Sequence, residues 1–467
     1  MDGLLQQYID VILESHRKWR DEWRSYTSDD SLDIEPEVLE SHLGALLERL
    51  RGNYPFFHPD YAGQMLKPPH PVAMLGYISA MLINPNNHAL DGGPPTGEME
   101  KEVVAQLAEF FGYTQHLGHL TSGGTVANME ALWAASREHP GKAIAFSSQS
   151  HYTHRRMCEV LGIPHIEVPT DTRGKMDMRA LERLLLSEDI GTVVATIGTT
   201  GVGALDPLPE IIRLKDRHSF RVHADAAYGG FYHVFSSEEQ SPVASDIYRA
   251  MQHCDSIVID PHKHGLQPYG CGCILFADPA VGKHYKHDSP YTYFTSEELH
   301  LGEISLECSR AGAAAAALWL TLRCFPLEAT NGIGSILWKC RAAALEWADL
   351  LRTSERWYLV LDPELDIVVF FPRTKEFTSQ AVSERSDSLF RMAMDDKERP
   401  VYLSKLRLPS AMIAARYPEF STRSEWTTVF RSTLMKPEHL GAVPGIHGRM
   451  DELLSELETQ DETRRMA

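Results

Sequence analysis

Short apolar runs alternate with amphipathic stretches through the middle of the chain, from about Gly118 to Lys263. The apolar runs are brief and uninterrupted, which is typical of strands buried on both faces of a sheet. Between them, apolar side chains recur at helical spacing, which predicts helices. The expected strands are 143–147, 166–168, 192–197, 220–224 and 257–259, and the expected helices are 125–137, 155–161, 178–186, 208–217 and 245–253. This order predicts an α/β fold with a mostly parallel sheet, in which ligands sit at the carboxyl ends of the strands.

The pattern changes toward both ends of the chain. Residues 1–50 carry apolar side chains at helical spacing, with a second helix expected from Pro36, so we expect an arm that covers the main domain or wraps a partner subunit. Residues 53–95 are rich in proline and glycine and are expected to be irregular. From about Asn331, a long helix at 336–351 and later strands predict a smaller α+β domain. We therefore predict a helical arm at 1–55, a large domain at 56–330 and a small domain at 331–467.

Composition narrows the possible partners. The formal net charge of -19 argues against nucleic acid or an anionic membrane as the main partner. The first residues show no signal-peptide pattern, and the longest small-apolar stretch, 311–322, is too short to span a membrane and predicts a packed helix. Seven cysteines without framework spacing indicate reduced thiols and a cytoplasmic location. Cys271 and Cys273 are read as small residues of a buried strand, and no metal is expected.

One lysine stands where a buried strand ends. The apolar run 257–259 stops at Asp260 and Pro261, because proline cannot continue a central ladder. Lys263 follows at once, and an amine in such a place is a candidate to form a Schiff base with an aldehyde. A single lysine is more often a solvated surface charge, so the other strand ends have to decide between the two interpretations.

Three further segments that follow strands or precede a helix carry polar groups that, like Lys263, could contact one small ligand. Gly124 and Thr125 belong to a glycine-rich loop before a helix, whose amides and hydroxyl can hold a phosphate, although an ordinary capped loop would look similar. Asp225 follows the strand 220–224 between small alanines, where a carboxylate could cap a helix, bind a metal or hold a ring nitrogen protonated. His151 follows the strand 143–147 and could stack on a planar cofactor. A planar aldehyde with a phosphate arm and a ring nitrogen needs this set of groups.

The order and the sequences of these motifs resemble those of the group II pyridoxal-phosphate decarboxylases, the family of aromatic amino acid, glutamate, histidine and tyrosine decarboxylases. The resemblance covers roughly residues 54–325, and its most specific parts are Asp-Pro-His-Lys at 260–263 and His-Ala-Asp-Ala-Ala-Tyr at 223–228. It implies a fold-type I enzyme with a seven-stranded sheet that uses pyridoxal 5'-phosphate to convert an L-amino acid to an amine and carbon dioxide. It also implies a homodimer with active sites at the subunit interface.

The resemblance assigns roles to individual residues. Lys263 would be the Schiff-base lysine, Asp225 would pair with the pyridine nitrogen, Ala227 would pack under the ring, and His151 would stack on its other face near the substrate carboxylate. The remaining cofactor contacts that it implies are Gly124 and Thr125 at the phosphate, Thr199 near the cofactor, and His262 beside the lysine. Asp260 departs from the asparagine that the animal aromatic enzymes tend to carry, which leaves its own contact open.

The resemblance also points to a proton donor and a structural arginine. In the family a loop tyrosine protonates the substrate α-carbon after carbon dioxide leaves, and Tyr291 and Tyr293 both qualify, with Tyr291 preferred because it directly follows Pro290. The alternative is that both tyrosines are packing aromatics. Arg310 resembles the arginine that follows this loop and is expected to be structural, at the dimer interface.

Two matters stay open at this point. A different reaction on the same cofactor, such as carbon–carbon cleavage, desulfuration or transamination, is possible, and an aminotransferase could use Arg431 as a carboxylate clamp. A non-catalytic homologue is the alternative of another class. The substrate is expected to have an aromatic or an acidic side chain. Residues 58–88 are expected to line its pocket, with Lys67, His70 and His88 for an acidic side chain and Tyr61 and Met65 for an aromatic one.

Overall fold

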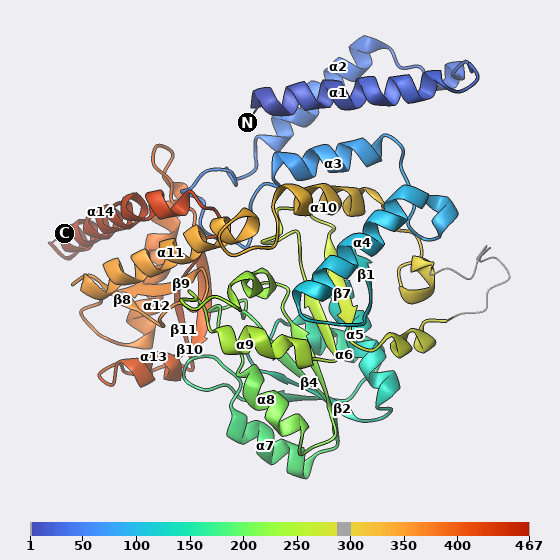
Figure 1. The fold of residues 1–467 in the computed structure, drawn as a ribbon. Helices are drawn as coiled ribbons and strands as arrows, with labels where there is room; N and C mark the ends of the chain where they lie inside the picture. Colours follow the sequence, from blue (N-terminus) through green and yellow to red (C-terminus); the bar gives the residue numbers. More distant parts are fainter. Residues whose placement is uncertain (1, 287–299, 467) are drawn as a thin grey trace.

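The computed structural model describes residues 2–286 and 300–466 (Figure 1). Seven strands form one sheet in the order β1-β7-β6-β5-β4-β2-β3, and all run parallel except β7, which pairs antiparallel with β1 and with β6. The strands are β1 (Leu117–Thr121), β2 (Ala143–Ser147), β3 (His165–Val168), β4 (Ile190–Thr196), β5 (Arg221–Asp225), β6 (Ser256–Ile259) and β7 (Gly272–Phe276). The predicted α/β fold with a mostly parallel seven-stranded sheet is therefore confirmed.

Helices cover both faces of this sheet. Successive side chains of each strand point to opposite faces, and the strands carry apolar side chains on both. Val193, Val222 and Ile257 belong to one apolar cluster, whereas Val194 and Val258 face clusters on the other side. The first cluster is completed by α4 (Pro94–Phe110), α7 (Met178–Ser187), α8 (Leu208–Lys215) and α9 (Ser245–Ala250), and the opposite clusters by α5 (Gly124–Glu138) and α6 (Thr153–Leu161). Both faces of the sheet are thus closed to solvent, and its carboxyl-end edge remains for a ligand.

A second, antiparallel sheet lies in the C-terminal part of the chain, in the order β10-β11-β9-β8 (Figure 1). Its own apolar cluster includes Trp347, Phe370 and Phe430. The elements of this part are α11 (Gly332–Thr353), β8 (Trp357–Leu359), β9 (Ile367–Pro372), α12 (Ser379–Asp395), β10 (Ser404–Pro409), α13 (Ser410–Arg416), β11 (Trp426–Thr433) and α14 (His439–Met466). The expected α+β character is confirmed, while the domain boundaries at 55 and 330 stay predictions.

The N-terminal helices α1 (Asp2–Asp21) and α2 (Pro36–Leu50) project from the body of the molecule, above α3 (Pro71–Met81) (Figure 1). Pro36 is the first residue of α2, as expected. The apolar side chains of α2 are exposed, including Leu43 and Leu47. An apolar helix face that the chain itself does not cover calls for a partner surface.

The structure also corrects the expectation for residues 53–95. This segment was expected to be irregular, but it contains the helix α3, which packs on α10 (Ala313–Cys324). Gly76 makes the contact possible, because a Cβ there would lie 2.8 Å from the Cα of Ala317. Proline and glycine weakened the helix signal, although Pro71 occupies the first helical turn, where proline is tolerated. Within the described residues, no helix combines the length and the apolar character needed to cross a membrane.

Candidate active site

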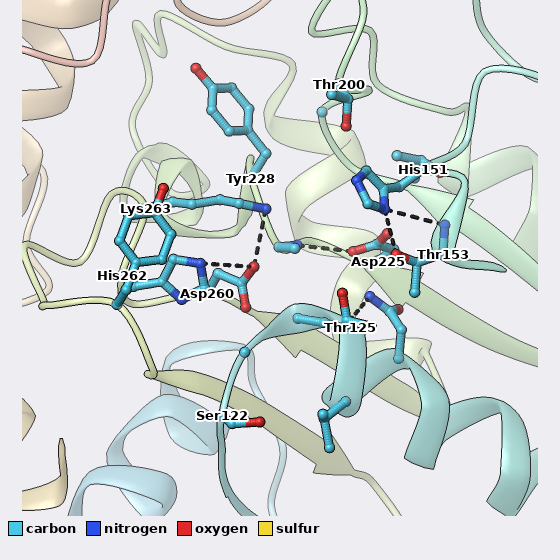
Figure 2. A pocket seen from close by; sticks show the side chains of 18 residues that line it. Ser122, Thr125, His151, Thr153, Thr200, Asp225, Tyr228, Asp260, His262 and Lys263 are labelled. Atoms are coloured by element: carbon cyan, nitrogen blue, oxygen red, sulfur yellow. Dashed lines mark hydrogen bonds and ion pairs between the residues drawn. The ribbon is translucent and has the colours of Figure 1, made fainter. Parts of the chain in front are cut away.

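A cavity of about 290 Å³ lies where β1, β2, β4, β5 and β6 end (Figure 2). The predicted edge of the sheet therefore carries the site. Its lining residues come from the last residue of a strand or from the segment that follows it. They are Ser122, Gly123, Gly124, Thr125, Val126, Asn128, His151, Thr153, Thr196, Gly198, Thr200, Asp225, Ala227, Tyr228, Asp260, His262, Lys263 and Tyr269.

Lys263 points into the cavity from the turn after β6, and its Nζ lies 3.0 Å from Oδ2 of Asp260 (Figure 2). Asp260 is buried, and its Oδ1 has no hydrogen-bond partner among the described residues. The carboxylate thus balances the charge of the amine and holds it at the strand end. His262 is tied down on the other side, since its Nδ1 lies 2.7 Å from the carbonyl of Cys271.

The glycine-rich loop approaches Asp260 directly. A Cβ on Gly124 would lie 2.5 Å from Oδ2 of Asp260, so a side chain at this position would displace Asp260 or the loop. Gly123 has φ +148°, a conformation that side chains rarely adopt. The helix α5 begins here, and the amides of Gly124 and Thr125 precede its first hydrogen bonds, which Val126 and Ala127 donate to the carbonyl of Gly123. Gly124 and Thr125 can therefore offer backbone N–H groups to an anion.

Asp225 is the last residue of β5, and both of its oxygens are engaged. Oδ1 accepts a hydrogen bond from the amide of Ala227 at 3.2 Å, and Oδ2 lies 2.8 Å from Nε2 of His154. Burial by itself raises the pKa of this carboxyl. The hydrogen bond from His154 and the electrostatic attraction of His154 and Lys263 outweigh burial, so the pKa of Asp225 lies well below its ordinary value. Asp225 is thus a carboxylate held ionised at the edge of the cavity.

The sequence reasoning missed His154. It lies on the first turn of α6, three residues after His151, and is fully buried. The one available signal was a second histidine directly after the same strand, and nothing in a linear spacing shows that its ring reaches β5.

A second buried histidine connects the sheet to the glycine-rich loop. Nε2 of His223 lies 2.9 Å from Oδ1 of Asn128, whose amide group donates to the carbonyl of Gly124. This orientation of Asn128 means that His223 donates through Nε2, while Nδ1 lies 2.9 Å from the hydroxyl of Ser256. Burial lowers the pKa of His223 to about 3, in keeping with a neutral ring.

His151 lies at the cavity with its ring fixed by the next helix. Nδ1 accepts from the amide of Thr153 at 3.3 Å and lies 2.6 Å from its hydroxyl. Because Nδ1 accepts, the proton of the neutral ring sits on Nε2. Burial lowers the pKa of His151, which favours this neutral form.

Asp366 is a buried carboxylate outside the cavity, and it connects the two sheets through hydrogen bonds. Asp366, just before β9, accepts from the hydroxyl of Tyr228 at 2.6 Å and lies 2.8 Å from Nε2 of His264. Nδ1 of His264 lies 3.0 Å from the carbonyl of Tyr228, so both ring nitrogens face acceptors. His264 therefore carries two N–H donors and pairs with an ionised Asp366, whose pKa is lowered because His264 and Tyr228 together outweigh its burial.

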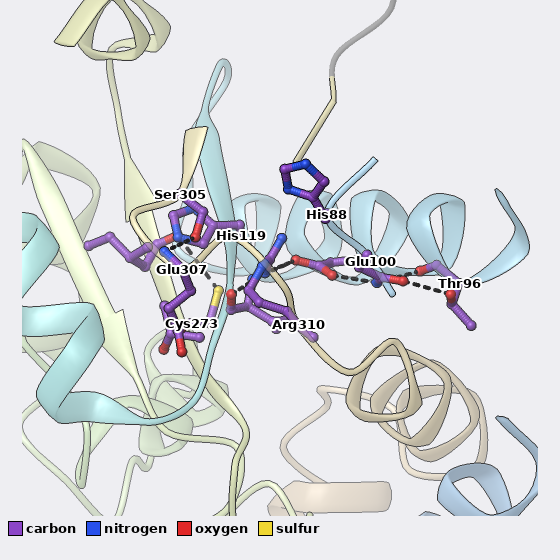
Figure 3. A network of polar contacts seen from close by, with 12 residues as sticks. His88, Thr96, Glu100, His119, Cys273, Ser305, Glu307 and Arg310 are labelled. Atoms are coloured by element: carbon purple, nitrogen blue, oxygen red, sulfur yellow. Dashed lines mark hydrogen bonds and ion pairs between the residues drawn. The ribbon is translucent and has the colours of Figure 1, made fainter. Parts of the chain in front are cut away.

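Arg310 anchors the chain where it returns toward the sheet (Figure 3). Its Nη1 lies 2.6 Å from Oε1 of Glu100 on α4 and also donates to the carbonyl of Leu120 on β1. Glu100 accepts in turn from Asn87 at 2.6 Å. The expected structural arginine is thus part of a buried network within one chain, and its place at a dimer interface stays a prediction.

The structure brings together most of the residues that the sequence singled out. Those that line the cavity are Lys263, Asp225, Ala227, His151, His262, Gly124 and Thr125. Thr199 does not line it. It is buried, its hydroxyl accepts from the amide of Ala204 at 3.0 Å, and its neighbour Thr200 reaches the cavity instead. Tyr291 and Tyr293 lie outside the described residues.

The segment 58–88 does not line the cavity of its own chain. Lys67, one of its proposed substrate contacts, donates instead to the carbonyl of Met435 at 3.2 Å. Arg431 donates to the carbonyl of Thr200 at 2.9 Å and to Oε1 of Gln64 at 3.1 Å, which are structural contacts within the chain. Among residues 2–286 and 300–466, no group of histidine, cysteine and acidic side chains is arranged to hold a metal ion.

Comparison with known proteins identifies the site. Residues 28–373 match the pyridoxal-dependent decarboxylase conserved domain. The chain belongs to the pyridoxal-dependent decarboxylase family. The resemblance drawn from the motifs is thereby confirmed, and the protein is a pyridoxal-phosphate-dependent amino acid decarboxylase.

Two curated relatives illustrate the relationship. The decarboxylase is 30% identical over 312 residues to the probable L-tyrosine/L-aspartate decarboxylase of Methanothermobacter thermautotrophicus, with 66% of this chain and 82% of that protein covered. It is 26% identical over 502 residues to the L-tyrosine decarboxylase of Enterococcus faecium, with 82% of each chain covered.

Solved structures share the fold at low identity. Oryza sativa TDC, solved with PLP and tryptamine, has a TM-score of 0.77 at 17% identity and is similar over 97% of this chain and 98% of its own. Mouse CSAD has a TM-score of 0.76 at 20% identity over the same shares. These likenesses concern the fold.

The groups around the cavity fit pyridoxal phosphate. The first-turn amides at Gly124 and Thr125 suit its phosphate, the ionised Asp225 suits a protonated ring nitrogen, and the amine of Lys263 suits its aldehyde. The hydroxyl of Thr196 and Oδ1 of Asp260 are buried at the cavity without a hydrogen-bond partner among the described residues, as expected of groups that await a polar ligand.

Proposed function

We propose that Lys263 and Asp225 have separate roles in the decarboxylation. Lys263 is the amine that holds the cofactor, and Asp225 is the group that keeps a proton on the ring nitrogen of the cofactor. The observation that carries this proposal is that an ionised carboxylate, Asp225, and an amine, Lys263, line the same cavity (Figure 2). Each lies at the end of a parallel strand. Bound pyridoxal phosphate supplies an aldehyde that captures the substrate amine and a ring that accepts the electrons left when carbon dioxide departs.

The other residues orient and shield the reacting atoms. Gly124 and Thr125 would hold the phosphate through backbone amides, and His262 would pack beside the lysine. Ala227 and His151 would lie on the two faces of the ring, with Nε2–H of His151 available to the substrate carboxylate. Tyr291 or Tyr293 would return a proton to the α-carbon. Thr199 was part of the expected set, and Thr200 is the better candidate because it lines the cavity.

A lysine variant tests this assignment. Lys263→Ala should lose the yellow colour of the bound cofactor and release carbon dioxide from an amino acid at less than about a thousandth of the parent rate. Lys283→Ala is the matched control, because this lysine is exposed and pairs with Glu138 away from the cavity. A Lys263→Ala protein that stays yellow and turns over at the parent rate would contradict the proposal.

We further propose that the substrate has an aromatic or an acidic side chain. The support is that the relatives above are named for L-tyrosine and L-aspartate. The cavity offers the rings of Tyr228 and Tyr269 to an aromatic group, and the imidazole rings of His151 and His262 as polar groups to an acidic one. Incubation with a panel of amino acids, with the amines read by mass spectrometry, separates the two, since L-tyrosine yields tyramine and L-aspartate yields β-alanine.

Transamination is the alternative reaction on this cofactor, and the environment of Arg431 speaks against it. Its two terminal nitrogens are already bound to Thr200 and Gln64. Equal amounts of amine and carbon dioxide, without a keto acid, are the expected products.

We also propose that the decarboxylase is a homodimer in which the N-terminal helices of two copies pack together and residues 58–88 of one copy approach the cavity of the other. Leu43 and Leu47 support this, because they lie one turn apart on α2 and are 47% and 55% exposed in one chain. Light scattering after gel filtration should give a dimer for the parent and a smaller species for the double variant Leu43→Glu, Leu47→Glu. Glu48→Gln on the same helix is the control, and a monomeric parent would contradict the proposal. The cytoplasmic location stays a prediction.

A further inference from the structure

His154 lies behind Asp225, on the side away from the cavity. It is fully buried on the first turn of α6 and is not among the lining residues. Its Nε2 lies 2.8 Å from Oδ2 of Asp225, and its Nδ1 has no partner among the described residues. Among the described residues, the contact with Asp225 is thus the one hydrogen bond of the His154 ring.

The direction of the hydrogen bond follows from the acceptor. An ionised carboxylate only accepts, so Nε2 of His154 donates. Oδ1 of Asp225 is fixed separately by the amide of Ala227 at 3.2 Å. With one donor on each oxygen, the carboxylate can neither rotate nor turn away from the cavity.

The neighbours of Asp225 show why this donor matters. The titratable groups that face it are His154 from α6, His151 from the segment before α6, His223 from β5 and Lys263 from the turn after β6. His223 donates to Asn128 and cannot also donate to Asp225. His151 is engaged with Thr153, and Lys263 with Asp260. His154 is therefore the one side chain among these four that hydrogen-bonds to the carboxylate.

Burial would otherwise favour the protonated acid. A carboxylate removed from water loses hydration, which raises its pKa. Burial is the largest single influence on the pKa of Asp225. The hydrogen bond from His154 is the largest influence in the opposite direction. A neutral Asp225 could not hold a proton at a ring nitrogen, so the ionised state depends on this donor.

We propose that His154 is a positioning residue for the decarboxylation, which keeps Asp225 ionised and aimed at the cavity through the bond from Nε2 to Oδ2. The inference rests on the proposed role of Asp225. His154 touches neither the cavity nor the reacting atoms, so its influence on the reaction passes through the carboxylate.

Two amide variants test the inference because they differ in reach. Glutamine places an N–H about where Nε2 of histidine lies, whereas the shorter asparagine does not reach Asp225. His154→Asn should lower kcat by about 10- to 100-fold with little change in KM, and His154→Gln should restore most of the loss. The acid limb of the pH profile of kcat should move to higher pH in His154→Asn, since Asp225 then takes up a proton more readily.

A spectroscopic readout separates positioning from packing. With isotopically labelled cofactor bound, the ring-nitrogen chemical shift should report a protonated ring in the parent and in His154→Gln, and loss of that proton in His154→Asn. If His154→Asn does not fold, as judged by urea unfolding of the cofactor-free protein, His154→Phe takes its place because it keeps the ring volume without a donor. Equal shifts and pH profiles in the two amide variants, or a folded His154→Gln as impaired as His154→Asn, would overturn the inference.

Asp225→Asn distinguishes this failure from failure of the proposed function. If Asp225→Asn keeps the parent rate and a protonated ring, the assigned role of Asp225 is wrong. If Asp225→Asn loses both and His154→Asn loses neither, the role of Asp225 stands and only the inference about His154 fails.

Discussion

At the scale of single residues, the cavity is built from contacts that leave almost no freedom to the side chains beside it. Gly124 shows this most directly, because its Cα packs against the carboxylate that pairs with Lys263. The sequence indicated the glycine as part of a phosphate loop. It did not indicate Asp260 as the group that requires it, since Gly124 begins α5 after β1 and Asp260 follows β6, far along the chain.

Gly124→Ala should therefore weaken cofactor binding. The added Cβ would press on Asp260, whose position is fixed by the ion pair with Lys263, so the phosphate loop must shift. We expect the Kd for pyridoxal phosphate to rise about tenfold, equivalent to about 1.4 kcal/mol, in an absorbance titration. Gly441→Ala is the control, because a Cβ there has open space around it. Equal affinities in the two variants would contradict the steric argument.

The sequence located residues that line the cavity where a group sits at a strand end, and it missed groups that lie behind the lining residues. Lys263, Asp225 and His151 were found because the carboxyl ends of parallel strands meet at one edge. His154 and Asp366 were not found, because their partners are distant in sequence and only the packing of α6 and β9 brings them close. Thr199 and Thr200 differ by one position in a turn, and periodicity cannot resolve a turn.

At the scale of elements, the strongest periodic signals were the most reliable. The five strands β2 to β6 and the helices between them were predicted to within a few residues, whereas β1 was not predicted. The apolar stretch at 311–322 was expected as a packed helix and is α10. Its partner α3 was missed because Pro71 and Gly76 reduced the helix signal. The small residues that weaken α3 as an isolated helix are those that let it approach α10.

Gly76→Val should destabilise this helix pair. The Cβ would meet Cα of Ala317 at 2.8 Å, and both atoms belong to packed helices. We expect the free energy of unfolding to fall by about 1–3 kcal/mol, seen as a lower urea midpoint. Met81→Leu, at an exposed position near the end of the same helix, should leave the midpoint unchanged. A Gly76→Val midpoint equal to that of the parent would show that the helices can separate at little cost.

At the scale of the whole molecule, the buried pair of Asp366 and His264 joins the second sheet to the turn that carries Lys263. Removing one charge from a fully buried pair leaves the other uncompensated. Asp366→Asn should lower the free energy of unfolding by about 3–5 kcal/mol and weaken cofactor binding as well. Both effects are measurable, by urea unfolding and by absorbance titration.

The control for this prediction is Asp362→Asn. Asp362 lies a few residues earlier and pairs with Arg352 and Arg416 at the surface, where an ion pair contributes about 1 kcal/mol or less. If the two variants unfold alike, the buried pair does not hold the two sheets together.

The pH dependence of stability is also a property of the whole chain. Burial lowers the pKa of His223 to about 3 and of His233 and His439 to about 4, against an ordinary value of 6.5. Between these values the unfolded chain binds protons that the folded chain does not, so the free energy of unfolding should fall as the pH drops below about 6.5. Asp206 works in the opposite sense, since burial raises its pKa to about 6, but it is one group against three.

Urea midpoints of the cofactor-free protein over this pH range test the expectation. His439→Asn should show a shallower decline than the parent, and His253→Asn, at an exposed position, should follow the parent. Midpoints that rise as the pH falls would mean that Asp206 dominates.

The ion pair of Arg310 and Glu100 bears on how this enzyme can be redesigned. It fixes the chain after residue 300 to α4 and β1, while Lys283 is tied to Glu138 on α5 before the chain reaches residue 287. The pair of Arg310 and Glu100 is buried, whereas Lys283 is 60% exposed, so the first contact is the firmer of the two. For an engineer, Arg310 and Glu100 are therefore positions to keep unchanged, because the buried pair holds the chain after residue 300 against α4 and β1.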